Sequence, residues 1–330
     1  MQPGKNIKIF INYFLGPLLF LWLLFSIYTQ IRNQPQLALS WQHIKNSFYS
    51  SNIFYLLFTI LLMCINWGLE AWKWKVAMIP IYPVSFRLAL KAILSGVSFS
   101  ISTPNRIGEY LGRMLFLPEG YRLKTIAVTL LSSISQLLIT LICGTIGLVW
   151  LKRHFIEAGI LHEIGYRFLL SGLLILQLII LLLYFKIAGL EKWIEHWMRN
   201  SKHLYLIQAL QQFRHYFLIR LLALSLLRYL VFIIQYLLLF SLFNVHVSAV
   251  LAAAVVSVVF LAMAIIPSIA LLEVGLRGEI NIRLMSLFSA NTLGIGLTAI
   301  TIWMINLLLP AIAGSILILG VKVFKKRNGD

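Results

Sequence analysis

Acidic side chains are scarce in this sequence, so the residues that could support acid–base or metal chemistry are few. Asp and Glu together number 10, against 28 Lys and Arg, and the one aspartate is Asp330. Paired aspartates, which many metal-dependent and intramembrane proteolytic sites require, therefore cannot be assembled. His162-Glu163 begins a string that resembles a zinc-protease motif, but Tyr166 stands where the second histidine ligand would be. We predict no enzyme activity, no metal and no cofactor.

The charges best placed to bind a ligand follow a proline that interrupts an apolar segment. Pro104-Asn105-Arg106-Ile107-Gly108-Glu109 is followed by Arg113. At membrane depth, such a break is tolerated where it is buried in protein or lines a wet cavity. A helix that begins near Asn105 would present its positive end to an anion. Glu109 and Arg113 share one helical face and can pair, and Gly112 permits close helix approach.

A second interrupted segment repeats this arrangement, with Pro267 followed by Glu273 and Arg277. Charges within a membrane are costly and usually face a cavity or a partner. Two interpretations stay open for both Glu–Arg pairs. They contact substrate directly, or they neutralise each other and hold two halves of the protein together.

The elements that must position these charges are membrane helices. Of the 330 residues, 60% are apolar and 12% are charged, about half the charged fraction of a soluble domain. We predict an all-α polytopic integral membrane protein with one membrane domain, residues 1–330. Seven apolar segments are about long enough to span a bilayer: Phe10–Ile31, Ile53–Leu69, Ile126–Leu151, Phe168–Phe185, Phe217–Phe243, Val247–Ile266 and Phe288–Val321.

The net charge of +18 does not indicate nucleic-acid binding, because the basic residues lie mainly between apolar segments, where they orient helices. The insert 186–216 carries Trp and basic residues typical of an amphipathic helix on the cytoplasmic membrane surface; a solvated loop is the alternative. Residues 67–75, with three tryptophans and two lysines, are interpreted as a headgroup anchor; a functional site is the alternative. Glu70 is expected to mark the end of a helix.

The chain also carries signs of an internal repeat. The spacing from Ser85 to Pro104 equals the spacing from Ser248 to Pro267. We predict half-repeats at residues 1–151 and 165–321, of which the second is inverted, as in many transporters. If Ser85–Pro118 and Ser248–Leu287 are re-entrant hairpins, the chain crosses six times with both termini cytoplasmic, in agreement with the positive-inside rule. If they span, it crosses eight times.

The two interrupted segments resemble those of the lysylphosphatidylglycerol synthase/flippase transmembrane-domain family. The first matches over Pro104 to Glu109 with Arg113, and the second departs by having Ile269-Ala270-Leu271-Leu272 where the family tends to have glycines. The resemblance implies a flippase-like protein of a bacterial cytoplasmic membrane, without the aminoacyltransferase domain of longer relatives. It also implies a lipid site at the following residues: Arg106, Glu109, Arg113, Glu273, Arg277, Pro104, Pro267 and Asn105.

The leading hypothesis is transbilayer movement of a phosphate-bearing lipid that is aminoacylated, glycosylated or polyprenylated. Its binding partner would be a membrane phospholipid or glycolipid, with a separate lipid-modifying enzyme as a further partner. Two alternatives stay open. The protein could be a non-transporting accessory protein for cell-envelope lipid synthesis, or a polytopic lipid-modifying enzyme.

Overall fold

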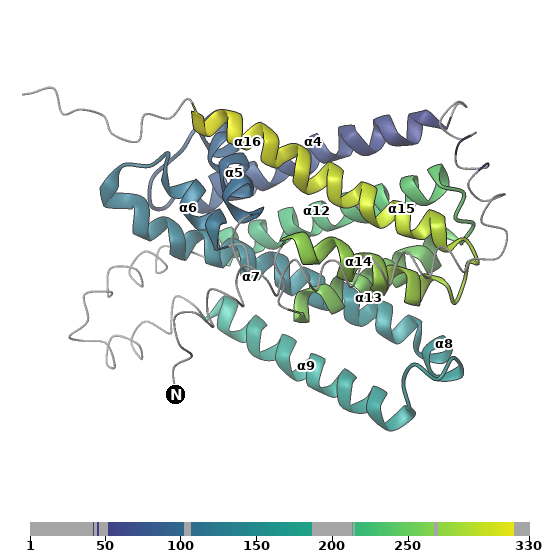
Figure 1. Cartoon of the computed structure of the whole chain (residues 1–330). Coiled ribbons are helices and arrows are strands. Elements are labelled where there is room, and N and C mark those ends of the chain that lie inside the picture. The colour runs from purple at the N-terminus through teal and green to yellow at the C-terminus, as the bar shows by residue number, and fades with distance from the viewer. Residues whose placement is uncertain are drawn as a thin grey trace, which may run out of the picture. The chain divides into compact units, whose positions relative to one another are not determined.

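The computed structural model describes residues 52–101, 107–186, 213, 215–266 and 270–319, together with Gln42 and Lys45. The elements assigned in these ranges are all helices (Figure 1). The predicted all-α membrane architecture is therefore confirmed. The helices are α4 (Ile53–Met78), α5 (Phe86–Ile101), α6 (Gly108–Met114), α7 (Glu119–Trp150), α8 (Lys152–Glu157), α9 (Glu163–Phe185), α12 (His215–Leu242), α13 (Ala249–Ile265), α14 (Ala270–Met285), α15 (Thr292–Trp303), the π-helical turn η3 (Met304–Leu308) and α16 (Leu309–Leu319).

Within the described ranges, five helical stretches are long and apolar enough to cross a membrane: Ile53–Met78, Gly120–Trp150, Glu163–Phe185, His215–Leu242 and Thr292–Leu317. They correspond to five of the six crossings expected with re-entrant hairpins; the sixth, Phe10–Ile31, lies outside the described residues. The segment Val247–Ile266 forms the shorter helix α13. Large apolar side chains are exposed on these helices, as on α9, where Phe168 is 75% exposed. Such exposure suits contact with lipid, because the hydrocarbon core is as apolar as the side chains.

The described residues fall into two compact units. The first comprises 52–64, Leu137–Ile179 and Tyr229–Ile305, and the second comprises Ile65–Gln136, Ile180–Arg228 as far as it is described, and 306–319. Helices α4, α7, α9 and α12 each contribute residues to both units. The half-repeats 1–151 and 165–321 are a different division of the chain and stay a prediction.

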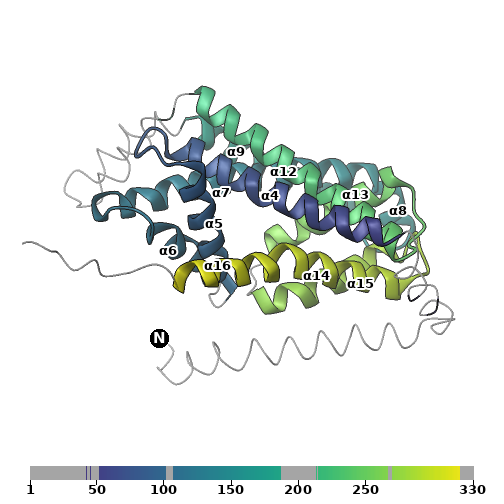
Figure 2. The same ribbon diagram turned by 90° about the horizontal axis from the view of Figure 1, so that it is seen from above.

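In the second unit, helix α5 is packed closely between α6 and α16, and the three lie beside one another in both views (Figures 1 and 2). A Cβ atom on Gly112 would lie 2.5 Å from the backbone of Gly96, so the α5–α6 contact is backbone to backbone. The predicted close approach at Gly112 is confirmed. On α16, the carbonyl oxygen of Ala311 accepts a hydrogen bond from the Ser98 hydroxyl.

The two ends of the first interrupted segment lie close together in space. The rings of Tyr82, before α5, and Tyr121, at the start of α7, have centroids 4.8 Å apart. The chain between them runs out along α5 and returns through α6, because these two helices pack against each other. This is the local geometry that a re-entrant hairpin requires, although its depth in a membrane stays a prediction.

The second interrupted segment, in the first unit, also returns to its start. The side-chain amide of Asn291, the N-cap of α15, donates to the carbonyl oxygens of Phe243 at 2.9 Å and Asn244 at 3.1 Å, just after α12. Between these points lie α13 and α14, which pack together. Both segments thus follow a long helix, open with a helix of 16 or 17 residues, and close next to where they began. The inversion of the second half relative to the first stays a prediction.

Helix α4 extends beyond the apolar segment Ile53–Leu69 to Met78. Residues 70–75, which were expected to belong to a membrane-surface anchor, are therefore helical, and several of them are buried. The expectation that Glu70 marks the end of a helix is wrong. Of the insert 186–216, the structure describes only residues 186, 213, 215 and 216, so the predicted amphipathic helix falls outside the described residues.

Candidate functional site

A cluster of buried charges lies within the second unit, centred on the carboxylate of Glu70 in α4. The whole Glu70 residue is 5% exposed. Its Oε1 accepts a hydrogen bond from Arg113 Nη2 at 3.0 Å, and its Oε2 lies 3.0 Å from Lys73 Nζ and 2.5 Å from Arg228 Nη1. One carboxylate is therefore shared by three cations that come from three different helices.

Arg113 is the cation contributed by α6, and it is 1% exposed. Its Nη2 atom also pairs with Glu109, one helical turn earlier, whose side chain is 24% exposed. The predicted Glu109–Arg113 pair is therefore confirmed. The pair is not isolated, because the same nitrogen joins it to Glu70. The close α5–α6 contact at Gly96 and Gly112 fixes the buried position of Arg113, because the backbone of α5 contacts Gly112, the residue directly before Arg113.

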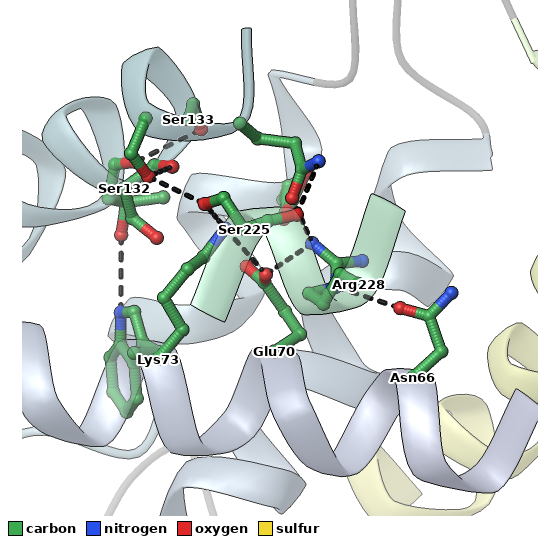
Figure 3. Close-up of polar contacts among 12 residues, drawn as sticks. Asn66, Glu70, Lys73, Ser132, Ser133, Ser225 and Arg228 are labelled. Carbon is green, nitrogen blue, oxygen red and sulfur yellow. Dashed lines mark hydrogen bonds and ion pairs between the residues drawn. The ribbon is translucent and has the colours of Figure 1, made fainter. Parts of the chain in front are cut away.

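Arg228 lies in α12 and is held on several sides (Figure 3). Its Nε donates to Asn66 Oδ1 at 2.8 Å, and its Nη1 donates to Gln136 Oε1 at 3.2 Å as well as to Glu70. Its guanidinium lies 5.8 Å from the centre of the Trp67 ring, in the range of a cation–π interaction. Arg228 is thus fixed by groups on α4 and α7.

Lys73 extends the cluster toward a group of hydroxyls. Figure 3 shows Glu70 and Lys73 on one helix, both directed toward Ser225 and Arg228. Lys73 Nζ lies 3.4 Å from Ser225 Oγ, and that hydroxyl lies 2.9 Å from Ser135 Oγ. Next to Lys73, the Trp74 indole donates to Thr129 Oγ1 at 3.3 Å. Helix α7 therefore presents a polar, buried face to α4 and α12 in this unit.

The charges in the cluster do not balance. Lys73, Arg113 and Arg228 are opposed by Glu70 and Glu109, so the described members carry a formal charge of +1. Among the described residues, buried Arg113 Nε and Nη1 also have no hydrogen-bond partner. An unpaired buried charge is unfavourable, and donors without acceptors point to a missing partner. The arrangement is suited to holding an anion.

Comparison with known proteins connects this site to a family. The family model described as the lysylphosphatidylglycerol synthase TM region matches residues 11–314. The chain belongs to this family. No curated protein and no solved structure is significantly similar to it. Family membership confirms the resemblance seen in the sequence and associates this multi-pass membrane protein with lipid-related processes.

The structure brings together only some of the residues that the family resemblance implied. Glu109 and Arg113 are joined in the cluster, whereas Pro104, Asn105, Arg106 and Pro267 lie outside the described residues. Glu273 lies in α14, and its side chain is not among those that the structure describes. Arg277, also in α14, belongs to the first unit, where its carbonyl oxygen accepts a hydrogen bond from Asn281 at 2.8 Å. Its role in lipid binding stays a prediction.

The interpretation of residues 67–75 as a headgroup anchor is wrong for its central members. Glu70, Lys73 and Trp74 are 5%, 1% and 0% exposed, because α4 continues past them and turns them toward α6, α7 and α12. Trp72, on the opposite side of the helix, is 54% exposed and still suits a membrane-interface position.

Two members of the cluster could have been found from the sequence. Arg228 stands within the apolar segment Phe217–Phe243, and Glu70 follows directly on the segment Ile53–Leu69. An ionisable residue inside a membrane helix is by default a functional candidate. Their mutual contact could not have been inferred, because it joins residues 158 positions apart.

The described residues contain no group of three or more His, Cys, Asp or Glu side chains that could hold a metal ion. Cys64 and Cys143 are both free thiols in the structure.

Proposed function

We propose that this protein moves a phosphate-bearing lipid between the two leaflets of a membrane, as a flippase-like transporter. The observation that carries the proposal is the buried cluster around Glu70, with an excess positive charge next to an interrupted helix. Guanidinium groups form strong, charge-assisted hydrogen bonds to phosphate oxygens. Family membership supplies the lipid context.

The geometry of the two interrupted segments supports transport over simple binding. Both segments return to the end where they began, as shown by the Tyr82–Tyr121 and Asn291–Phe243 contacts. Inverted repeats with interrupted helices at corresponding positions are a hallmark of transporters that expose one site to alternate sides. In this proposal the hairpins are re-entrant, one from each side, and the membrane is a bacterial cytoplasmic membrane with both termini inside.

In this proposal each charged residue has a role that its contacts support. Arg113 contacts the lipid phosphate, and Glu109, which is partly exposed, either orients Arg113 or meets a cationic headgroup. Glu70 holds Lys73, Arg113 and Arg228 in one place despite their mutual repulsion. In the second half, Glu273 and Arg277 are proposed to take the corresponding positions.

The test is lipid translocation in proteoliposomes, with anionic, aminoacylated and polyprenyl-phosphate lipids and leaflet-specific detection. We expect one lipid class to move, and Glu109→Gln to abolish the movement without unfolding the protein. Glu157→Gln is the matched control, because Glu157 and Arg153 form the same i,i+4 pair at an exposed position.

If well-folded protein moves no lipid of the panel, transport is wrong. Stable co-purification with a lipid-modifying enzyme would then support the accessory role. Consumption of lipid by the purified protein in the presence of an acyl or glycosyl donor would instead show an enzyme.

A further inference from the structure

The three cations around Glu70 differ in how completely their hydrogen-bonding capacity is used. Arg228 donates through Nε to Asn66 and through Nη1 to Glu70 and Gln136, and it also contacts the Trp67 ring. Lys73 contacts Glu70 and Ser225. Arg113 uses only Nη2, which it directs at both Glu70 and Glu109, while Nε and Nη1 are without a partner among the described residues.

Open donors on a guanidinium that is 1% exposed are unusual, since an unsatisfied buried donor is costly and native proteins hold few of them. Arg228 is 8% exposed and Lys73 1% exposed, so burial alone does not distinguish the three cations. What distinguishes Arg113 is its position on α6, next to α5. Among the three cations, the open guanidinium nitrogens therefore lie on the interrupted segment. Asn66 Nδ2 and Trp67 Nε1 in α4 are also without a partner in the described part of the chain, but they carry no charge.

A second unsatisfied group lies at the same helix crossing. Ser95 in α5 is 0% exposed, and its hydroxyl has no partner in the described part of the chain. A Cβ on Gly112 would lie 2.6 Å from the carbonyl carbon of Ser95, and a Cβ on Gly96 would lie 3.4 Å from Arg113 Cγ. The free hydroxyl and the free guanidinium nitrogens are thus contributed by adjacent positions of two helices in backbone contact.

We propose that Arg113 Nε and Nη1, together with the Ser95 hydroxyl, form a subsite for one oxyanion of the phosphate type. The subsite would take a group with a single negative charge, because that charge neutralises the formal +1 of the described cluster. Arg228 is in this view a positioning residue, which holds Glu70 and leaves Arg113 available. This inference rests on the proposed function, since it specifies which groups contact the lipid phosphate.

The test measures binding to the purified full chain in a non-ionic detergent, through the shift of the thermal unfolding midpoint with ligand concentration. The probes are inorganic phosphate and a short-chain phosphatidylglycerol, at matched ionic strength. We expect saturable stabilisation of the wild type. Binding of both probes indicates a site for a free anion, and binding of the lipid alone indicates a headgroup site; either supports the subsite.

Three variants separate the roles. Arg113→Lys should weaken binding roughly 10- to 100-fold, the effect of losing a hydrogen bond to a charged group. Ser95→Ala should weaken it about fivefold without lowering the midpoint in the absence of ligand, because the hydroxyl has no partner there to lose. Arg153→Lys is the control, because Arg153 is exposed and lies outside the cluster, and this variant should keep the wild-type affinity.

Wild-type-like binding by both Arg113→Lys and Ser95→Ala would overturn the proposal, as would an equal loss in Arg153→Lys. An unfolding midpoint of the wild type that neither probe shifts would also overturn it and indicate that water satisfies these donors. The proposed transport can fail separately. Binding without translocation refutes transport alone, and translocation unaffected by Arg113→Lys refutes the subsite alone.

Discussion

Arg113 Nη2 donates a hydrogen bond to Glu70 Oε1 at 3.0 Å, between two buried residues that are 43 positions apart. The bond connects α6, the short helix after the chain interruption, to the long helix α4. Because Arg113 also pairs with Glu109 and Glu70 also pairs with Lys73 and Arg228, this bond joins a local i,i+4 pair to a tertiary network.

Replacing Glu70 with glutamine should destabilise the protein strongly. The neutral amide leaves three buried cations without their shared counter-ion, and breaking a buried pair in this way typically costs about 3–5 kcal/mol. Glu109→Gln should cost less, because Glu109 pairs with one cation among the described residues, Arg113, and its side chain is 24% exposed. Thermal unfolding in detergent measures both. Equal midpoints for the two variants would show that Glu70 is not the centre of the cluster.

Lys73 and Lys75 should respond differently to substitution with methionine, although they are two positions apart. Lys73→Met removes a buried ammonium that contacts Glu70 and Ser225, so we expect a lower unfolding midpoint. Lys75 is only half-buried, and its substitution should have little effect, as is usual for positions away from buried networks. Similar behaviour of the two variants would restore the interpretation of both lysines as headgroup anchors.

Gly112→Ala should separate α5 from α6. The added Cβ would lie 2.5 Å from backbone atoms of Gly96, which cannot rotate away, and overpacking of this kind costs about 1–3 kcal/mol. Gly68→Ala is the matched control, because a Cβ there has nothing within 4 Å and lies within helix α4. That control should be neutral or stabilise the protein by up to about 1 kcal/mol. We also expect Gly112→Ala, and not Gly68→Ala, to reduce lipid translocation, because it displaces Arg113.

Cysteine labelling in a background with Cys64 and Cys143 replaced would test the re-entrant hairpins. Ser85→Cys and Gly120→Cys, both at exposed positions, flank the first segment and should react with a membrane-impermeant reagent from the same, cytoplasmic side. Ser248→Cys and Ser286→Cys, near the ends of the second segment, should react together from the outer side. Labelling of the members of either pair from opposite sides would show that the segment between them spans the membrane.

The sequence alone was sufficient for the membrane class and for most helix positions. An apolar run of about 20 residues can satisfy its backbone in lipid only as a helix, so composition and length carry this information locally. The Glu109–Arg113 pair and the close approach at Gly112 were predictable for the same reason, since both depend on spacing within one helix. The family resemblance, too, came from short stretches of contiguous residues, the two interrupted segments.

Only the tertiary structure decided that Glu70 and Lys73 are buried, that Arg228 reaches them, and that Arg113 belongs to their network. A tryptophan- and lysine-containing helix end has the same composition at a membrane surface as inside a bundle. What distinguishes the two is which helices pack against it. That packing depends on long-range contacts, such as Arg228 with Asn66 and Ser98 with Ala311, and no periodicity within a single helix encodes them.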